Sequence, residues 1–458
     1  MTTERHTRLV VIGGGPGGHS AASTAARLGA DVTLIEKDVY GGAAHLWDCI
    51  PSKTMIATGG ALTFAQRITG MGLEQLDAHL DQSAQRRRVD RIEGYLNGQV
   101  VQLLESQGVR MLKGVGRLKG PHEVVAETAT GVEEIDADAV VIATGTRPRI
   151  PGWAEPDGDR ILTTRQAYPP PSIPEHLVVI GSGVTGVEFV HMFSAFGAKV
   201  TLIVSRQQVL PSKDPEVAAA LEDNLLRRGV RLFKGARAEM IQRTDDGGVA
   251  VACDDGRVAL GSHALFCIGS IPNSDGLGLE SAGVDLDRGG YVVVNQHCQS
   301  NVPHIYAAGD VSGKLPLSSV ASMQGRKIAE HAMGLHTREH QHIDYDKAAS
   351  AIFTEPEIAD VGLAETEAFA SGRKIRVTKV PYQSTAKALI NDDPGGFVKI
   401  VSDPATGVVL GGSIVGRHAA ELISVIALAV TAHLKVSDIV ESCLVHPTLS
   451  EALADAAE

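Results

Sequence analysis

"RLVVIGGGPGGHSAASTAARLGADVTLIE", residues 8–36, is the stretch that decides the fold. An apolar run leads into a turn containing Gly13, Gly15 and Gly18, and an alanine-rich helical stretch then leads into a second apolar run. A strand, a Gly-x-Gly-x-x-Gly turn, a helix and a second strand are typical of a unit whose helix N-terminus binds a dinucleotide pyrophosphate. The glycines allow the backbone to approach the phosphates. The stretch therefore predicts an α/β fold that holds a dinucleotide.

The same pattern returns at residues 176–204, "HLVVIGSGVTGVEFVHMFSAFGAKVTLIV". Its glycines are Gly181, Gly183 and Gly186. The first copy ends in Glu36, a carboxylate suited to accept hydrogen bonds from an adenosine ribose and to repel a 2′-phosphate. The second copy ends in Val204, followed by Ser205 and Arg206, a hydroxyl and a cation suited to a 2′-phosphate. Two different dinucleotides are implied; the alternative for Arg206 is a solvated surface residue.

Length and composition narrow the class of protein. A chain of 458 residues predicts two or three domains, and a net charge of -12 argues against a general nucleic-acid binder. Its five cysteines are scattered and odd in number, without metal-ligand spacing, which predicts no bound metal and a reducing, cytoplasmic location. The N-terminal residues have no apolar signal core, and the apolar run at 422–430 is too short for a bilayer span. We therefore expect a soluble protein with no membrane insertion.

Several further motifs occur in a fixed order along nearly the whole chain. They are "GGGPGG" at 13–18, "CIPSK" at 49–53, "ATGTRPRIPG" at 143–152, "GSGVTGVEF" at 181–189, "CIGSIPN" at 267–273, "IYAAGD" at 305–310, "FTEPEIADVGL" at 353–363 and "HPTLSE" at 446–451. In this order they resemble the flavoprotein disulfide reductases, the family of dihydrolipoamide dehydrogenase and glutathione reductase. The order is far more specific than any one motif.

The resemblance implies a fold class and a domain organisation. The fold is α/β, with two Rossmann-type dinucleotide-binding domains plus an α+β C-terminal dimerisation domain. The FAD-binding domain is split between residues 1–150 and 275–345. The NAD(P)-binding domain covers residues 151–274, and the dimerisation domain covers residues 346–458. A homodimer follows, in which the C-terminus of one subunit completes the active site of the other.

The resemblance also assigns individual residues to two cofactor sites. For FAD these are Gly13, Gly15, Gly18, Glu36, Gly41, Gly42, Lys53, Gly116, Thr144, Gly145, Asp310, Leu317 and Ser318. For NADPH or NADH they are Gly181, Gly183, Gly186, Ser205, Arg206 and Gly269. The catalytic assignments are Lys53 and Glu188 beside the flavin N5, Cys49 as the flavin-side sulfur, and His446 with Glu451 as the pair that manages protons.

The chain departs from the family at residues 41–53, "GGAAHLWDCIPSK". Members that exchange dithiols carry a second cysteine five positions before the one that corresponds to Cys49, and this chain has Ala44 there. A methyl group cannot form a mixed disulfide, so thiol–disulfide exchange has lost its attacking atom. The pattern resembles a branch that lacks the interchange cysteine and is associated with quinone reduction. We therefore predict an enzyme that passes electrons from NAD(P)H through flavin directly to a quinone.

Four alternatives stay open at this point. Cys49 could cycle through sulfenic acid in an NADH oxidase or peroxidase. The chain could be a soluble pyridine nucleotide transhydrogenase, which also needs only flavin. It could be a dihydrolipoamide dehydrogenase rescued by another thiol, such as Cys443. It could also be a non-catalytic FAD-binding subunit, although the intact Lys53, Glu188, His446 and Glu451 argue against that.

Overall fold

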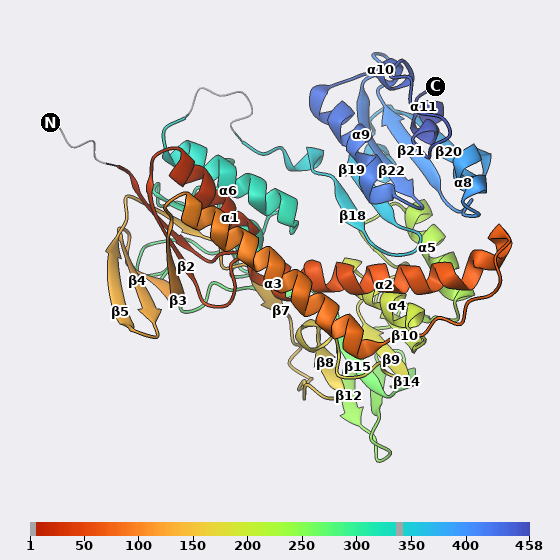
Figure 1. The fold of residues 1–458 in the computed structure, drawn as a ribbon, viewed down its shortest axis with the longest axis horizontal. Helices are drawn as coiled ribbons and strands as arrows, with labels where there is room; N and C mark the ends of the chain where they lie inside the picture. The colour runs from red at the N-terminus through yellow and green to blue at the C-terminus, as the bar shows by residue number, and fades with distance from the viewer. Residues whose placement is uncertain (1–5, 336–341) are drawn as a thin grey trace. The chain divides into compact units, whose positions relative to one another are not determined.

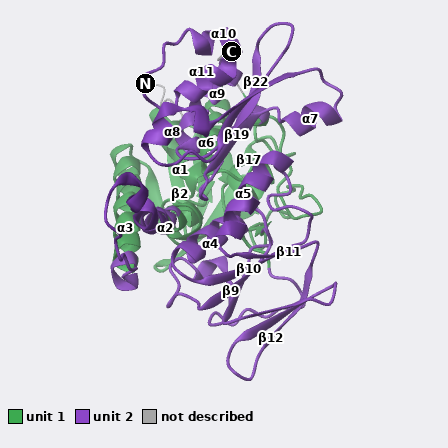
Figure 2. Cartoon of the chain, turned by 90° about the vertical axis from the view of Figure 1, so that its right-hand side faces the viewer, with its two compact units in different colours: residues 1–52, 86–149, 270–345 green, residues 53–85, 150–269, 346–458 purple. Residues whose placement is uncertain are grey.

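The computed structural model describes residues 6–335 and 342–458 (Figure 1). The chain forms two compact units (Figure 2). Unit 1 consists of residues 1–52, 86–149 and 270–345, and unit 2 consists of residues 53–85, 150–269 and 346–458. Most of the predicted FAD-binding domain falls in unit 1, and most of the other two predicted domains falls in unit 2. The domain boundaries stay a prediction.

The centre of unit 1 is a seven-stranded sheet with the order β17-β6-β1-β2-β3-β4-β5. Its strands are β1 (Arg8–Ile12), β2 (Asp31–Glu36), β3 (Arg110–Gly120), β4 (Glu123–Thr128), β5 (Gly131–Asp136), β6 (Ala139–Ile142) and β17 (Ile305–Ala307). Strands β17, β6, β1, β2 and β3 pair in parallel, whereas β3, β4 and β5 form an antiparallel ribbon. Strands β1, β6 and β17 are almost continuously apolar, as expected where both faces of a parallel sheet are covered.

Alternate residues of β1 enter different cores. Leu9 and Val11 pack with side chains of α1 (Pro16–Arg27) and α6 (Ser318–Ala332), whereas Val10 and Ile12 belong to a second core on the other face. The two helices cross closely, because a Cβ on Gly325 of α6 would strike the carbonyl oxygen of Gly17. A two-stranded ribbon of β7 (Thr146–Pro148) and β16 (Ser270–Pro272) and the short helix η4 (Gly309–Ser312) also lie in unit 1.

Unit 2 contains a second parallel sheet, with the order β11-β10-β9-β15-β8. Its elements are β8 (Ile161–Thr163), β9 (His176–Ile180), α4 (Val184–Ala195), β10 (Lys199–Val204), α5 (Pro215–Arg227), β11 (Arg231–Lys234) and β15 (His263–Phe266). An antiparallel ribbon of β12 (Ala238–Arg243), β13 (Val249–Cys253) and β14 (Val258–Gly261) shares its core. The β9–α4–β10 segment is the second predicted dinucleotide unit.

The C-terminal part of unit 2 is built on a five-stranded antiparallel sheet, β18-β19-β22-β21-β20. The strands are β18 (Ser350–Ile352), β19 (Ile358–Gly362), β20 (Arg376–Pro381), β21 (Phe397–Ser402) and β22 (Val409–Val415). The helices are α7 (Glu365–Ala370), α8 (Ala386–Ile390), α9 (Ala419–Ala432), α10 (Val436–Val440) and α11 (Glu451–Ala457). Apolar residues of α9 and α11 share one core with the sheet. The predicted fold class, two Rossmann-type domains and an α+β C-terminal domain, is confirmed.

Two long helices each contain one of the points where the chain passes from one unit to the other. They are α2 (Ile50–Arg67) and α3 (Gln82–Ser106). Within unit 2, the hydroxyl of Thr58 in α2 donates to Gln85 Oε1 of α3 at 2.8 Å. Among the described residues, no helix combines the length and apolar character that crossing a bilayer requires.

Candidate functional site

The first glycine turn has a backbone that excludes side chains at two positions and leaves a third open. Gly13 has a φ of +104°, and a Cβ there would strike the carbonyl of Ala143. A Cβ on Gly18 would strike the carbonyl oxygen of Gly13, whereas one on Gly15 would meet nothing within 4 Å. Gly15 is the N-cap of α1, and this fully described helix has neither a side-chain cap nor an acidic residue in its first turn. Its N-terminal N–H groups are therefore available to an anion.

Glu36 is fixed beside this turn at the end of β2. Its side chain is buried, and Oε2 accepts the N–H of Gly14 at 2.6 Å while Oε1 accepts the N–H of Asp38 at 2.6 Å. Each carboxylate oxygen has a second lone pair that can accept a hydroxyl. The arrangement suits a ribose whose hydroxyls are free, as the sequence predicted.

Four other predicted FAD residues lie on loops of unit 1. Gly41, with a φ of +125°, donates its N–H to the carbonyl of Gly14 at 2.8 Å. The next residue, Gly42, lies so close to Gly15 that a Cβ would come within 2.8 Å of its Cα. Thr144 donates its hydroxyl to the carbonyl of Asn273 at 2.8 Å, and Gly145 follows with a φ of +66°.

Asp310 makes a polar contact in a short helix, whereas Gly116 is packed against apolar side chains within a strand. Asp310 lies in η4, where it accepts the hydroxyl of Thr146 at 3.1 Å, and burial raises the pKa of its carboxyl group. Gly116 lies within β3, where a Cβ would press against Ile12 and Ile35 at 3.1 and 3.2 Å. The structure gives Gly116 a packing reason to be glycine, so its predicted contact with FAD stays a prediction.

Cys49 follows a single π-helical turn, η1 (Ala44–Asp48), and stands immediately before α2. The N–H of Cys49 donates to the carbonyl of Ala44 at 3.2 Å, so the backbone brings positions 44 and 49 together. The sulfur of Cys49 lies 3.2 Å from the hydroxyl of Ser318, the first residue of α6, whose N-cap is Leu317. A methyl group therefore occupies position 44 in a turn that still joins it to Cys49.

Unit 1 thus has the features that a flavin dinucleotide requires. The open helix N-terminus at Gly15 fits a pyrophosphate, and a Cβ there would project into the same space. Glu36 fits an adenosine ribose, and the partly buried carboxyl of Asp310 fits a polar chain that carries hydroxyls. When bound, FAD would supply a two-electron carrier to this site.

The second glycine turn repeats the first. Gly181 has a φ of +108° and would clash with the carbonyl of Cys267 if it carried a Cβ, and Gly186 would clash with the carbonyl oxygen of Gly181. A Cβ on Gly183, the N-cap of α4, would meet nothing within 4 Å. Gly269, with a φ of +91°, also has open space around it. The second turn is therefore equally suited to a pyrophosphate.

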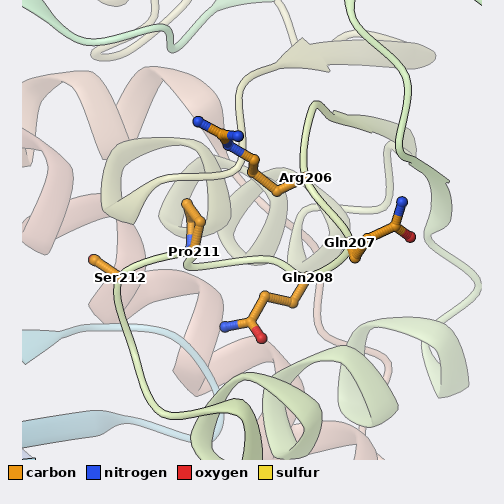
Figure 3. A pocket seen from close by; sticks show the side chains of 5 residues that line it. All are labelled: Arg206, Gln207, Gln208, Pro211 and Ser212. Carbon is orange, nitrogen blue, oxygen red and sulfur yellow. The ribbon is translucent and has the colours of Figure 1, made fainter. Parts of the chain in front are cut away.

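An open pocket of about 540 Å³ lies directly after β10 (Figure 3). It is lined by Arg206, Gln207, Gln208, Pro211 and Ser212. The side chains of Arg206 and Gln207 point to different sides of the loop (Figure 3). Arg206 was predicted from the sequence, whereas the four others were missed because no motif marks the loop after Arg206. Ser205 is exposed at the start of this loop.

Two predicted charge pairs are formed within unit 2. Lys53 Nζ lies 2.9 Å from Glu188 Oε2, and the other carboxylate oxygen of the buried Glu188 accepts the N–H of Phe353 at 3.0 Å. His446 Nδ1 lies 2.7 Å from Glu451 Oε1. Hydrogen bonds from His446 and from the N–H of Thr448 lower the pKa of Glu451. Because that carboxylate stays ionised, it can accept a hydrogen bond from the imidazole and orient it.

The His446 side chain is 72% exposed, as expected of a residue that acts on another molecule or subunit.

The cysteines other than Cys49 lie in different surroundings. Cys253, Cys267 and Cys298 are buried, and Cys443 is exposed. Burial raises the pKa of Cys298 to about 11, which keeps that thiol protonated at neutral pH.

Comparison with protein-family models matches nearly the whole chain. Residues 7–325 match the pyridine nucleotide-disulphide oxidoreductase model, and residues 348–457 match the dimerisation domain of the same family. The chain belongs to the pyridine nucleotide-disulphide oxidoreductase family. It is therefore a flavoprotein oxidoreductase that uses FAD and NAD(P)H, and it carries the family's dimerisation domain. The predicted family is confirmed.

The similarity to individual relatives extends over almost the full length of both chains. The chain is 42% identical to an NAD(P)H dehydrogenase (quinone) of Mycobacterium tuberculosis, over 98% of this chain and 93% of that one. It is 34% identical to a dihydrolipoyl dehydrogenase of Zymomonas mobilis, over 98% and 96% of the two chains. The crystal structure of LpdA from Mycobacterium tuberculosis superposes with a TM-score of 0.93, at 42% identity and with 98% and 99% coverage. The HOCl-induced flavoprotein disulfide reductase RclA of Escherichia coli superposes with a TM-score of 0.86, at 25% identity and with 99% of each chain covered.

Proposed function

We propose that this flavoprotein is an NAD(P)H:quinone oxidoreductase that works without a redox-active disulfide. The observation that carries the proposal is Ala44, a methyl group in the turn that leads into Cys49. Thiol exchange needs an attacking sulfur at that position, whereas a planar quinone can take two electrons without one. The similarity to an NAD(P)H dehydrogenase (quinone) supports the same choice.

The chain's own residues supply binding, orientation and a proton. In the overall reaction NAD(P)H, a quinone and one proton give NAD(P)⁺ and a quinol. We propose that His446, held by Glu451, delivers that proton to a quinone oxygen as a general acid. We assign the Lys53–Glu188 ion pair to the nicotinamide–flavin reaction, because both residues match the family's motifs. The exposed position of His446 agrees with a homodimer in which it serves the partner's site.

We further propose that NADPH is used at least as well as NADH. The pocket after β10 contains the guanidinium of Arg206, which can bind a 2′-phosphate. Val204 stands where the first dinucleotide unit has Glu36, so no carboxylate at that position repels the phosphate. We place the enzyme in the cytoplasm, on the basis of its cysteine content.

An anaerobic acceptor panel tests the proposal. The yellow protein is reduced with NADPH or NADH and then mixed with a quinone, oxidised lipoamide, glutathione disulfide, hydrogen peroxide or the other nucleotide. We expect fast reoxidation by the quinone alone. Fast reoxidation by lipoamide would show that another thiol has replaced the missing sulfur. Fast reoxidation by the other nucleotide would identify a transhydrogenase, and no reoxidation would identify a non-catalytic subunit.

Variants of Cys49 and His446 separate direct electron transfer from thiol chemistry. We expect Cys49→Ser to keep most quinone reduction, because its sulfur exchanges no bond. We expect His446→Ala to lower quinone turnover by about 10²–10⁴, the range of general acid catalysis. If Cys49→Ser abolishes turnover with every acceptor, the sulfenic acid mechanism replaces the proposed one.

A further inference from the structure

The loop that lines the pocket after β10 is held on the second dinucleotide unit at its start and middle. The N–H of Gly235 donates to the carbonyl of Arg206 at 2.9 Å, which fixes the beginning of the loop. Leu210 has a φ of +49°, uncommon for a residue with a side chain, and its N–H donates to the carbonyl of Ser182 at 2.8 Å. Ser182 lies within the second glycine turn, so the loop and the turn are joined directly.

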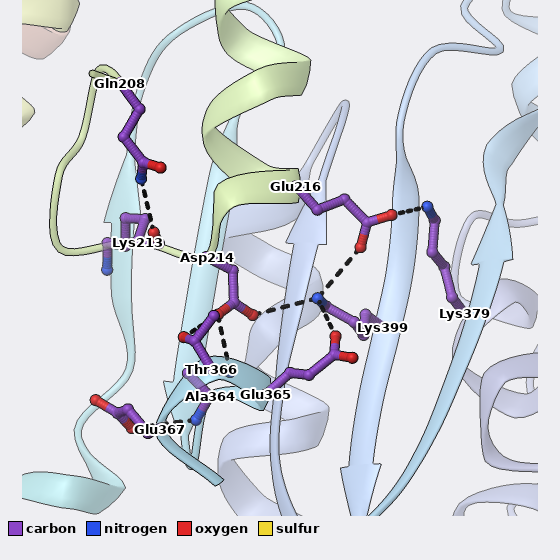
Figure 4. Close-up of polar contacts among 10 residues, drawn as sticks. All are labelled: Gln208, Lys213, Asp214, Glu216, Ala364, Glu365, Thr366, Glu367, Lys379 and Lys399. Atoms are coloured by element: carbon purple, nitrogen blue, oxygen red, sulfur yellow. Dashed lines mark hydrogen bonds and ion pairs between the residues drawn. The ribbon is translucent and has the colours of Figure 1, made fainter. Parts of the chain in front are cut away.

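The end of the loop is bound to the C-terminal sheet instead (Figure 4). Lys213 Nζ lies 2.5 Å from Asp360 Oδ2 of β19 and 3.1 Å from the hydroxyl of Ser350. Its backbone carbonyl accepts the side-chain amide of Gln208 at 3.0 Å, which ties a pocket residue to the anchored end. The next residue, Asp214, accepts the hydroxyl of Thr366 at 2.5 Å.

Lys399 of β21 completes this attachment. Its side chain is 2% exposed, and its amine contacts Asp214 at 3.2 Å, Glu216 at 3.2 Å and Glu365 at 2.9 Å. Burial alone would lower the pKa of Lys399, but hydrogen bonds and charge from Glu365 and Asp214 raise it. The amine therefore stays charged at neutral pH, and a buried charge is tolerated only where such partners surround it.

The side chain of Asp214 makes these contacts instead of capping the helix that begins after it. It is the N-cap residue of α5, a position where aspartate usually accepts an N–H of the first helical turn. Its side chain makes no capping hydrogen bond in this structure. One oxygen accepts Thr366 and the other contacts Lys399, so the side chain holds the loop to the C-terminal sheet and leaves the helix uncapped.

We propose that Asp214, Thr366 and Lys399 are positioning residues that set the conformation of the 2′-phosphate pocket. The C-terminal sheet would then control which nucleotide the second dinucleotide unit accepts. The pyrophosphate is served by the glycine turn, so the effect falls on the part of NADPH that Arg206 would bind. This inference rests on the NADPH assignment made under the proposed function.

Calorimetric titration of the holoenzyme with 2′,5′-ADP and with 5′-AMP tests the proposal. Only the first ligand carries a 2′-phosphate. We expect Thr366→Val and Lys399→Met to weaken 2′,5′-ADP binding by about fivefold to twentyfold, because each removes a polar contact that holds Asp214, and to change 5′-AMP binding by less than about twofold. Thr366→Ser keeps the hydroxyl and should restore the wild-type affinity.

Lys379→Met is the matched control. Lys379 pairs in register with Lys399 on the adjacent strand and contacts Glu216. Its side chain is 41% exposed, and its polar contact in the described part of the chain is with Glu216 rather than with Asp214. We expect its 2′,5′-ADP affinity to match that of the wild type. If Lys399→Met does not fold, Thr366→Val and its serine rescue decide the question.

Two outcomes would overturn the proposal, and they distinguish failure of the positioning role from failure of the NADPH assignment. If Arg206→Glu weakens 2′,5′-ADP binding while Thr366→Val and Lys399→Met bind it like the wild type, the positioning role is wrong and the NADPH assignment stands. If the wild type binds 2′,5′-ADP no better than 5′-AMP and Arg206→Glu changes nothing, both the NADPH assignment and the positioning role are wrong.

Discussion

Gly13 and Gly181 adopt φ angles of +104° and +108°, and Gly18 and Gly186 each leave no room for a Cβ against the turn. The two dinucleotide units of this chain therefore share one backbone design. They differ at the end of the second strand of each motif. The first dinucleotide unit has the buried Glu36 there, and the second has Val204, followed by the pocket that Arg206 lines. We propose that the turn binds the pyrophosphate in both units, whereas one or two side chains about twenty residues later select the ribose.

The largest effect is expected from filling the glycine turns. In Gly186→Ala the new Cβ would strike the carbonyl oxygen of Gly181, and in Gly18→Ala it would strike that of Gly13. Misplacing bound groups by about 1 Å can reduce a rate about a hundredfold, so we expect Gly186→Ala to stay yellow while reduction by NAD(P)H falls on that order. Gly18→Ala should instead lose flavin absorbance. The assignment of the two sites would be wrong if both variants lost the same ligand.

Reversing the charge at the second ribose site is the next test. Arg206→Glu replaces a cation by an anion in the pocket, and a charge-assisted contact of ~1.5–3 kcal/mol corresponds to a roughly ten- to hundredfold rise in KM for NADPH. KM for NADH should stay near its wild-type value. Steady-state kinetics with one quinone and both nucleotides measures the ratio. An unchanged ratio would show that Arg206 faces solvent.

A smaller effect is expected at the first ribose site. Glu36→Gln keeps the length of the side chain but removes its charge, and one carboxylate oxygen becomes an amide nitrogen that cannot accept the N–H it now binds. Since a hydrogen bond to a charged group contributes ~1.5 kcal/mol or more, we expect FAD affinity to fall about tenfold. Flavin release during dialysis measures the loss. Nicotinamide nucleotide binding serves as the internal control, because it should not change.

The smallest effect is expected from lowering the pH, which should weaken the contacts of Asp214 at the end of the loop after β10. Burial opposes ionisation of Asp214, but hydrogen bonds from Thr366 and the charge of Lys399 outweigh it and lower the pKa. A carboxyl with a lowered folded-state pKa adds stability that is full above its unfolded value, near 3.9, and is lost as pH falls through the folded value. Asp214→Asn should therefore be less stable than wild type by about 1 kcal/mol at neutral pH.

Urea unfolding of both proteins at several pH values checks this. The gap between their free energies of unfolding should be constant from pH 7 to about pH 5 and should shrink once the pH falls below about 3.9. A gap that persisted at the lowest pH would show that the ionised carboxylate of Asp214 is not what stabilises the loop.

Much of this arrangement could be predicted from the sequence because it is local. Gly13, Gly15 and Gly18 occupy fixed positions between a strand and a helix, and Glu36 ends the next strand, so their spacing determines where they lie. His446 and Glu451 are five residues apart, and they form the expected pair. The role of Gly116 was less visible, because a glycine required for packing against Ile12 and Ile35 looks the same in sequence as one that contacts a ligand.

Other features could not be found in this way. The π-helical turn over Ala44–Asp48 has no established sequence pattern, and the pocket residues Gln208 and Ser212 lie in a loop without periodicity. Nothing in the local sequence marks Lys399, since its partner Asp214 lies far away in the chain. Contacts of this kind depend on how distant segments pack, and no spacing within either segment reports them.

The buried amine of Lys399 also constrains how this part of the chain can evolve. Replacing the lysine alone leaves Asp214, Glu216 and Glu365 facing one another, and replacing Asp214 alone removes a charge from the most buried side of the cluster. Single changes in either direction leave an imbalance that a second change must correct. Among descendants of a common ancestor, we therefore expect these positions to be inherited or exchanged as a set, and to appear as covarying columns when many relatives are aligned.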